Sequence, residues 1–240
     1  RILSLSPATT ELLFALQAES KVVAVTDDCN YPAAAKQKPS VGRFGNILLE
    51  KIAKTRPDLI VTTADMHSRL EPLKALSVPV LALQTRHLQD LMDNTQLLGR
   101  MTQQAPRATQ LIQQWKTHLP SLGGQSPTTF YMVWHDPLMA ASSHSFIGDL
   151  IVKAGGKNVV TASAPFLRYR LESLLKADPQ LLILPKSLAR QLDLTRAPYA
   201  RLQAVKRKHI LVMEDDIISR PGPRSFDALR QMHGYIKANF

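Results

Sequence analysis

Short apolar runs alternate with amphipathic helical segments along most of the chain. Seven runs have the length and apolar character of buried strands, namely Ile2–Leu5, Val22–Val25, Leu59–Thr62, Val80–Leu83, Thr129–Val133, Leu181–Leu184 and Ile210–Met213. Helical patterns between and after them cover Pro7–Ala18, Leu48–Thr55, Arg69–Leu76, Phe146–Ala154 and Ser225–Ala238. Strands that alternate with helices predict parallel sheets with crossover helices, and therefore an α/β fold.

The middle of the chain breaks this alternation. From about His87 to Leu119 the pattern is helical and contains no strand candidate, and residues 120–127 then form a loop rich in Gly, Ser and Pro. We therefore expect two Rossmann-like α/β lobes joined by a long rigid helix. The N-terminal lobe would cover residues 1–100, the connecting backbone helix 101–122 and the C-terminal lobe 123–240. Because a helix bends less than a Gly/Ser linker, the lobes should move little.

Composition narrows the class of protein. A single cysteine, Cys29, excludes an internal disulfide and a thiolate zinc site. Thirty Lys and Arg against nineteen Asp and Glu give a formal net charge of +11, which favours an anionic partner. The basic residues are scattered, however, and their densest run is Lys206-Arg207-Lys208. Aromatic residues make up only 6% of the chain, so we do not expect nucleic-acid binding.

The sequence carries no common catalytic signature. A GxSxG elbow, a P-loop and an HExxH motif are all missing from it. The glycines of Ala154-Gly-Gly-Lys-Asn158 follow a predicted helix rather than a strand, so they do not form a dinucleotide fingerprint. We expect no enzymatic activity, and a hydrolase built from dispersed Asp and His residues is kept as a distant alternative.

Two similar segments occur in the two halves of the chain. Leu49-Glu50 is followed, seven residues after the glutamate, by Pro57 and a strand, and Leu171-Glu172 is followed at the same spacing by Pro179 and a strand. Acidic residues near a helix N-terminus interact favourably with the helix dipole, which alone would explain either glutamate. The equal spacing indicates a further possibility, that each lobe carries one carboxylate in an equivalent place.

An ordered set of short motifs resembles one known family over nearly the whole chain. The segment Arg1-Ile-Leu-Ser-Leu-Ser-Pro-Ala-Thr-Thr-Glu11 is similar to the first strand and helix of the periplasmic vitamin B12 and iron-siderophore binding proteins of ABC importers. Further matches, in order, are Tyr31-Pro32, Val41-Gly42, Leu49-Glu50, Arg56-Pro-Asp-Leu-Ile60, Phe146-Ile-Gly-Asp-Leu-Ile151, Ala154-Gly-Gly156, Leu171-Glu172 and Pro221-Gly-Pro-Arg224. The segments Thr26–Pro32 and Val133–Met139 look most like the vitamin B12 branch.

The resemblance implies a function and a set of functional residues. Family members hold their ligand in a cleft between two lobes and dock on a membrane permease through one glutamate per lobe, which match Glu50 and Glu172. The implied ligand-binding residues lie on loops after strands; they are Asp28, Tyr31, Arg43, Phe44, Trp134, His135, Phe166, Arg168, Asp216 and Arg220. The vitamin B12 proteins have tryptophans at the positions of Phe44 and Phe166, and an Asp and an Arg that match Asp216 and Arg220.

Several of the implied ligand contacts have a simpler alternative. Phe44, Trp134 and Phe166 would equally serve as core residues of their lobes, and Arg168 and Arg170 as solvated loop residues. The histidines His67, His135 and His144 would approach a metal centre axially or remain polar loop residues, and no pair of them has a metal-ligand spacing on one helix.

The ligand is expected to be a cobalamin, with a ferric siderophore second and haem third. No intrinsic cofactor and no protein-bound metal are expected. The expected partners are an ABC permease with its ATPase and a small metal chelate, and the protein is expected to be a monomer. The expected location is periplasmic or extracytoplasmic, with the leader absent from this chain, and lipid anchoring is left open.

Overall fold

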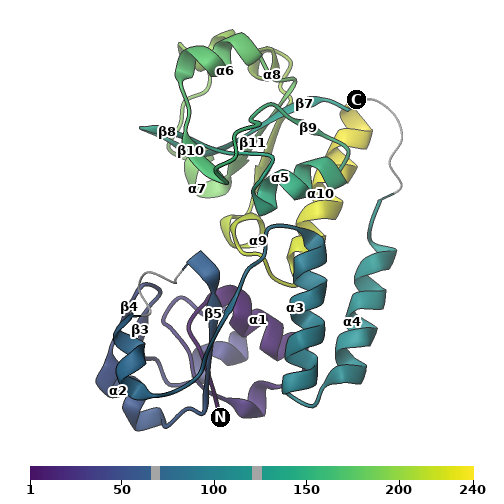
Figure 1. Ribbon diagram of the computed structural model, residues 1–240. Coiled ribbons are helices and arrows are strands. Elements are labelled where there is room, and N and C mark those ends of the chain that lie inside the picture. The colour runs from purple at the N-terminus through teal and green to yellow at the C-terminus, as the bar shows by residue number, and fades with distance from the viewer. Residues whose placement is uncertain (66–70, 121–125) are drawn as a thin grey trace. The chain divides into compact units, whose positions relative to one another are not determined.

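The computed structural model describes residues 1–65, 71–120 and 126–240, which form two compact α/β units (Figure 1). Unit 1 comprises Arg1–Thr85 and Gln89–Thr117, and unit 2 comprises Arg86–Leu88 and His118–Phe240. All seven strands that the hydrophobic pattern predicted are present, and the prediction of an α/β fold is confirmed. Among the described residues, no helix combines the length and the apolar character needed to cross a bilayer.

Unit 1 is built on a four-stranded parallel sheet with the order β2-β1-β5-β6. Its strands are β1 (Ile2–Ser4), β2 (Val22–Ala24), β5 (Leu59–Thr63) and β6 (Val80–Leu83), and a separate hairpin is formed by β3 (Gly42–Arg43) and β4 (Asn46–Ile47). Its shorter helices are α1 (Pro7–Ala15), α2 (Leu49–Thr55) and the 3-10 turns η1 (Glu19–Lys21), η2 (Ala33–Gln37) and η4 (Glu71–Leu76). The core lies between sheet and helices and includes Leu3, Ile52 and Ile60.

The long helical segment in the middle of the chain is two helices and not one. They are α3 (Leu88–Met101) and α4 (Ala105–Thr117), and Gln103 between them has a left-handed backbone with φ of 61°. A Cβ at Gly99 would lie 2.5 Å from the Ala108 Cβ, so these small residues allow α3 and α4 to approach closely. Of the expected connecting helix, residues 105–117 are α4, whereas residues 121 and 122 lie outside the described residues. The expected domain boundaries stay a prediction.

Unit 2 contains a six-stranded sheet with the order β10-β8-β7-β11-β12, and β9 pairs with β7. The strands are β7 (Thr128–His135), β8 (Leu138–Ala141), β9 (Lys157–Asn158), β10 (Phe166–Arg168), β11 (Leu181–Pro185) and β12 (Ile210–Met213). The helices are α5 (Phe146–Lys153), α6 (Leu171–Ala177), α7 (Lys186–Ala189), α8 (Gln203–Lys206), α9 (Asp215–Ser219) and α10 (Ser225–Asn239), with a 3-10 turn η5 (Tyr199–Arg201).

The sheet of unit 2 is mixed, which corrects the expectation that both sheets are parallel. Strands β9, β11 and β12 extend the parallel part of the sheet around β7, whereas β8 is antiparallel to β7 and to β10. Only Asp136 and Pro137 separate β7 from β8. A connection this short cannot form a crossover, so the chain must turn back beside its own strand.

Two glycines of unit 2 differ sharply in their surroundings. A Cβ at Gly148 in α5 would lie 2.2 Å from the Ser142 carbonyl oxygen and 2.8 Å from the Ser143 Cα, whereas a Cβ at Gly234 in α10 would meet no atom within 4 Å. Backbone atoms cannot move aside as a flexible side chain does. The first turn of α5 therefore packs directly against the backbone of Ser142 and Ser143, which precede the helix.

We predict that Gly148→Ala lowers the free energy of unfolding by about 1–3 kcal/mol, because the added methyl group overlaps the backbone. Gly234→Ala is the matched control and should stabilise the protein by up to about 1 kcal/mol, because alanine favours a helix interior. Urea denaturation followed by circular dichroism measures both changes. Equal effects of the two substitutions would contradict this account of α5.

Candidate functional site

The carboxyl ends of the strands in unit 1 meet at one edge of its sheet, because all four strands are parallel. Ser6 follows β1 at this edge and caps α1, its side-chain oxygen accepting a hydrogen bond from the Thr9 amide at 3.3 Å. The loop from Thr26 to Tyr31 follows β2, and Ala64 and Asp65 follow β5. In open α/β sheets this edge is the usual place for a ligand.

The loop after β2 is fixed from below by a buried polar cluster. The Thr10 hydroxyl donates to the Cys29 sulfur at 3.1 Å, and the Thr26 hydroxyl lies 3.2 Å from the same sulfur. Cys29 is buried, and its amide donates to the Thr26 carbonyl at 3.0 Å. Tyr31 at the end of this loop has 47% of its surface exposed. The loop thus presents an aromatic ring from a backbone that is held in place.

The β3–β4 hairpin is tied to the same loop. The Asp27 amide donates to the Gly42 carbonyl at 2.8 Å, and the Phe44 amide donates to the Asp28 carboxylate at 2.6 Å. Gly42 has φ of 119°, and a Cβ there would lie 2.6 Å from the Asn46 carbonyl oxygen. Of the residues predicted to bind ligand in unit 1, Asp28 and Phe44 are therefore in direct contact.

Phe44 and Arg43, at the tip of the hairpin, differ in burial. Phe44 is half-buried and packs against the core of unit 1, whereas Arg43 is exposed. Phe44 therefore acts in part as a core residue of unit 1, because its half-buried side chain contributes to the packing there. Arg43 is available to a ligand in solution.

In unit 2, the predicted aromatic residues share one exposed face of the sheet, which we call the aromatic strip (Trp134, Met139, Phe166 and Arg168). Trp134 is opposite Met139, and Met139 is opposite Arg168. Residues directly opposite in an antiparallel pair point to the same face, and Phe166 is two residues from Arg168 on β10. Trp134 and Phe166 are 40% and 49% exposed. The strip therefore offers two aromatic rings, a thioether and a guanidinium on one surface.

A β-bulge places Trp134 on this face. The register between β7 and β8 shifts between Met132 and Trp134, so that Met132 is opposite Ala140 while Trp134 is opposite Met139. The extra residue on β7 reverses the side to which Trp134 points relative to regular alternation. Met132 and Ala140 are buried, and Trp134 is exposed.

His135 and Trp134 form a ring pair at the end of β7. Their ring centroids are 5.4 Å apart with an interplanar angle of 37°, and the Trp134 indole N–H donates to the Asp136 carbonyl at 2.9 Å. The indole is thereby held in one orientation.

Asp216 and Arg220 form an ion pair in the segment after β12. The Arg220 guanidinium lies 2.8 Å from the Asp216 carboxylate, and only 17% of the arginine side chain is exposed. Both residues follow β12, which is separated from β10 by β8, β7 and β11. At about 4.8 Å per strand, the two outer strands are roughly 19 Å apart. The segment after β12 does not stay at that outer strand, however, because Ser219, the neighbour of Arg220, is hydrogen-bonded to Tyr131 on the central strand β7.

Helix α9, which carries Asp216, is anchored to the sheet by a buried tyrosine. Tyr131 on β7 is buried and hydrogen-bonded to Ser219, and burial raises its pKa far above the usual range of tyrosine, an effect that this hydrogen bond opposes. Because the phenol stays neutral, it acts as a hydrogen-bonding group and not as a charge.

Sequence reasoning missed a second polar group at the carboxyl edge of unit 2. Lys186 follows β11 and forms an ion pair with Glu214, which follows β12. The Ser187 amide donates to the Asp215 carboxylate at 3.0 Å, and the Ser187 hydroxyl donates to the same carboxylate. Their position directly after two neighbouring parallel strands was the signal that would have identified them. These contacts lock the starts of α7 and α9 together.

The predicted docking glutamates occupy equivalent positions in two helices of the same construction. Glu50 is the second residue of α2 and Glu172 the second of α6; each helix has seven residues. The helices end at Arg56 with φ of 44° and Asp178 with φ of 38°, and each is followed by a buried proline and a strand. Both glutamates are exposed, and among the described residues neither carboxylate forms a hydrogen bond or ion pair.

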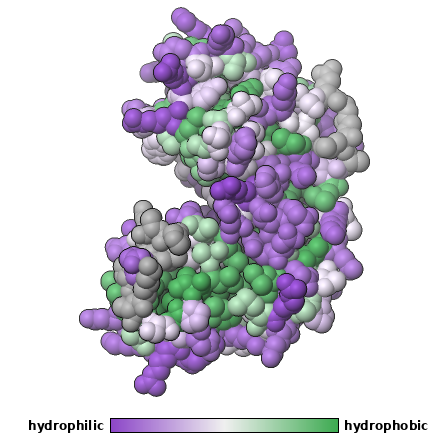
Figure 2. Space-filling model, viewed as in Figure 1, coloured by the Kyte–Doolittle hydropathy of each residue, from purple (hydrophilic) through white to green (hydrophobic). Residues whose placement is uncertain are grey.

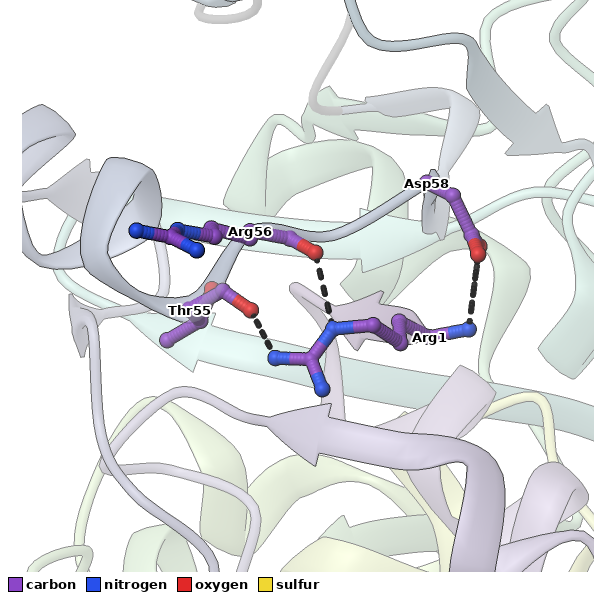
Figure 3. A network of polar contacts seen from close by, with 4 residues as sticks. All are labelled: Arg1, Thr55, Arg56 and Asp58. Carbon is purple, nitrogen blue, oxygen red and sulfur yellow. Dashed lines mark hydrogen bonds and ion pairs between the residues drawn. The ribbon is translucent and has the colours of Figure 1, made fainter.

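Side chains from distant segments fix the C-terminal ends of both helices. The Arg1 guanidinium donates to the carbonyl oxygens of Thr55 and Arg56 at the end of α2 (Figure 3). The backbone amino group of Arg1 forms an ion pair with the Asp58 carboxylate at 3.0 Å. At the end of α6, the Gln203 side-chain amide donates to the Asp178 carbonyl. These bonds satisfy carbonyls that a helix C-terminus leaves without partners.

The histidines give little support to metal coordination. His67 lies outside the described residues, and a His144 ring nitrogen lies 3.0 Å from the Ala162 carbonyl oxygen. Within the described ranges, no group of three or more His, Cys, Asp or Glu residues is arranged to hold a metal ion.

Comparisons with known proteins agree on one family. A family model described as "Periplasmic binding protein" matches residues 2–231. The vitamin B12-binding protein of Vibrio vulnificus is 27% identical over 97% of this chain and 88% of its own length. The crystal structure of the periplasmic vitamin B12 binding protein BtuF of Vibrio cholerae has a TM-score of 0.84 and 26% identity, covering 100% of this chain and 97% of that one.

A further solved structure bears a different name. It is a possible iron-binding (periplasmic solute-binding) protein from Staphylococcus epidermidis, with a TM-score of 0.84 and 26% identity over 98% of each chain. The fold is therefore shared by proteins whose names state different ligands.

We predict that Asp28→Ala speeds hydrogen exchange of the Phe44 amide by about tenfold or more, because this amide loses its charged acceptor. Asp28→Asn is the matched control and should change the rate less, since its side-chain oxygen still accepts. Hydrogen exchange of the ligand-free protein, resolved at the hairpin peptide, gives both rates. Unchanged exchange in Asp28→Ala would show that the hairpin is ordered without this bond.

Proposed function

The chain belongs to the periplasmic binding protein family, a family of non-enzymatic ABC substrate-binding proteins, and we propose that its ligand is a cobalamin. The aromatic strip of unit 2 is the observation that carries this proposal. Large flat chelates are held by aromatic contacts together with a few oriented polar groups, and the strip combines Trp134 and Phe166 with Arg168. The names of the Vibrio relatives support the same ligand.

Unit 1 would contribute the second group of ligand contacts. Tyr31 and Arg43 are exposed, and Phe44 is placed beside Asp28 by a main-chain hydrogen bond. Asp216 and Arg220, which match an Asp and an Arg of the vitamin B12 proteins, would add an ion pair from the segment after β12. Capture of one ligand by both units, as the family resemblance implies, stays a prediction.

A ferric siderophore is the second candidate, favoured by a different observation. Arg43 and Arg168 are exposed cations among the predicted ligand contacts, and guanidinium groups bind carboxylate and catecholate oxygens well. The name of the Staphylococcus epidermidis structure is consistent with an iron ligand. Haem remains third, because it would need an axial His or Tyr such as His135 or Tyr31.

The proposed mechanism requires no bond chemistry from the protein. The ligand binds to surfaces whose side chains are already in position. The ligand-bound protein then docks on the permease through Glu50 and Glu172 and releases the ligand there. Single surface ion pairs contribute only about 0–1 kcal/mol each. Two carboxylates on rigid helices act together, so the second contact forms at high effective concentration and fixes the orientation. This mechanism places the protein outside the cytoplasm, next to its permease.

We predict saturable one-to-one binding of cyanocobalamin in calorimetric titration. Phe166→Ala should weaken this binding by about tenfold to a hundredfold, because the ring loses its stacking surface. Val152→Ala is the control, since Val152 in α5 is 48% exposed and lies outside the strip. Silence with cyanocobalamin and saturable binding of an anionic ferric siderophore would instead assign the protein to iron uptake.

We predict that Glu50→Ala and Glu172→Ala each leave ligand affinity unchanged and abolish uptake in cells that express the cognate permease. The reason is that each substitution removes one of two ionic contacts needed for productive docking. Glu19→Ala, another exposed glutamate of unit 1, should transport normally. Loss of ligand binding in either docking variant, or normal uptake by both, would contradict the assignment.

A further inference from the structure

The amino-terminal edge of the sheet in unit 2 carries an excess of positive charge. The chain reaches this edge before β9, β11 and β12, in residues 153–157, 176–180 and 206–209. These segments hold six Lys and Arg residues and one carboxylate, Asp178. We call the six the basic edge; they are Lys153, Lys157, Lys176, Lys206, Arg207 and Lys208, and all are exposed.

Strand pairing brings these segments together although they are far apart in sequence. Lys157 is opposite Thr128 at the start of β7, and β11 and β12 begin on the same side because they are parallel to β7. The Leu182 amide donates to the His209 carbonyl at 3.1 Å, which places the end of the Lys206–Lys208 run beside β11. The surface over α6 and α8 is mainly hydrophilic in Figure 2.

The charge of the basic edge is not neutralised by ion pairs among residues 1–65, 71–120 and 126–240. None of the six cations forms an ion pair in the part of the chain that the structure describes. Asp178 is already engaged, since its carboxylate accepts from the Gln203 amide at 2.7 Å. At the corresponding edge of unit 1 the charge is partly compensated, because Arg1 is held by carbonyls and by Asp58 (Figure 3). The Lys38 ammonium there donates to the Glu19 carbonyl, whereas Lys54 and Arg56 are exposed and form no ion pair with other described residues.

We propose that the basic edge binds the anionic phosphate headgroups of a lipid bilayer. Clusters of four to eight Lys and Arg typically attract acidic membranes, each contributing a modest, salt-screened attraction. Nucleic acid is the less suitable polyanion, because five of the six cations are lysines, which lack the forked guanidinium with which arginine binds a phosphate through two hydrogen bonds.

The inference rests on the proposed function in one respect. Glu172 is four residues from Lys176 in the same helix, so about 6 Å of helix separates the predicted docking carboxylate from the basic edge. A protein docked through Glu172 would hold the basic edge near the bilayer that surrounds the permease. Weak attraction to this surface raises the local concentration of the binding protein and the rate of docking.

The test measures co-sedimentation of the full chain with vesicles, without ligand or permease. Vesicles of phosphatidylglycerol and phosphatidylcholine in equal parts should bind the protein at low salt, and vesicles of phosphatidylcholine alone should not. Replacing Lys206, Arg207 and Lys208 together by Glu should weaken binding by about a hundredfold. Lys153→Gln with Lys157→Gln, on another segment of the edge, should weaken it by about tenfold.

The matched control replaces Lys36, Arg100 and Lys116 by Glu. These three are exposed cations of unit 1, so the net charge falls by the same amount and only its place differs. The control should lose less than about threefold in affinity. Equal losses in the two triple variants, or no binding of the wild-type chain to anionic vesicles, overturn the proposal.

Two further readouts separate the remaining outcomes. Binding of a DNA duplex that exceeds binding to anionic vesicles, and that the Lys206–Lys208 substitutions abolish, overturns the proposal in favour of a polynucleotide. Chelate titration of the same variants reports the proposed function independently. Vesicle binding without chelate binding would support membrane binding by the basic edge and contradict the proposed function. Chelate binding without vesicle binding would overturn membrane binding by the basic edge and leave the proposed function intact.

Discussion

Parallel pairing of the strands is the constraint on which the rest of this structure depends. Because β1, β2, β5 and β6 run in one direction, as do β7, β9, β11 and β12, each unit has one edge where strands end and one where they begin. The loops at these edges are free to carry different side chains. In unit 2 the Lys186–Glu214 and Asp216–Arg220 pairs follow the carboxyl ends of the strands, and the amino edge holds six exposed cations. The common direction of the parallel strands thus allows the two edges of the sheet in unit 2 to carry different charged groups.

The same constraint explains why α2 and α6 are suitable for holding a carboxylate in a defined place. A crossover helix of seven residues is too short to be stable alone. It is held because its C-terminal residue turns into the left-handed region and a proline leads directly into a buried strand. Arg1 and Gln203 complete the attachment from outside the helix. The exposed glutamate in the first turn of each of these two helices is therefore held in a fixed position relative to the sheet.

The aromatic strip depends on a departure from regular geometry. Regular alternation along β7 would direct Trp134 to the same face as Met132, which is buried. The bulge between them turns the indole to the exposed face, where β8 and β10 bring Met139 and Arg168 alongside. Bulges often re-aim side chains at functional sites, and here one extra residue separates a core position from a surface position.

The sequence alone determined the features that depend on local periodicity. It predicted the seven core strands, the α/β class and the equal spacing of Glu50 and Glu172 from Pro57 and Pro179, because each is encoded by residues close together in the chain. Only the tertiary structure decided which predicted contacts are neighbours. Strand pairing places Phe166 and Arg168 with Trp134, and the turn of the chain after β12 pairs Asp216 with Arg220. Strand order, bulges and the antiparallel β8 arise from pairing between distant segments, and the spacing of residues within one segment carries no record of them.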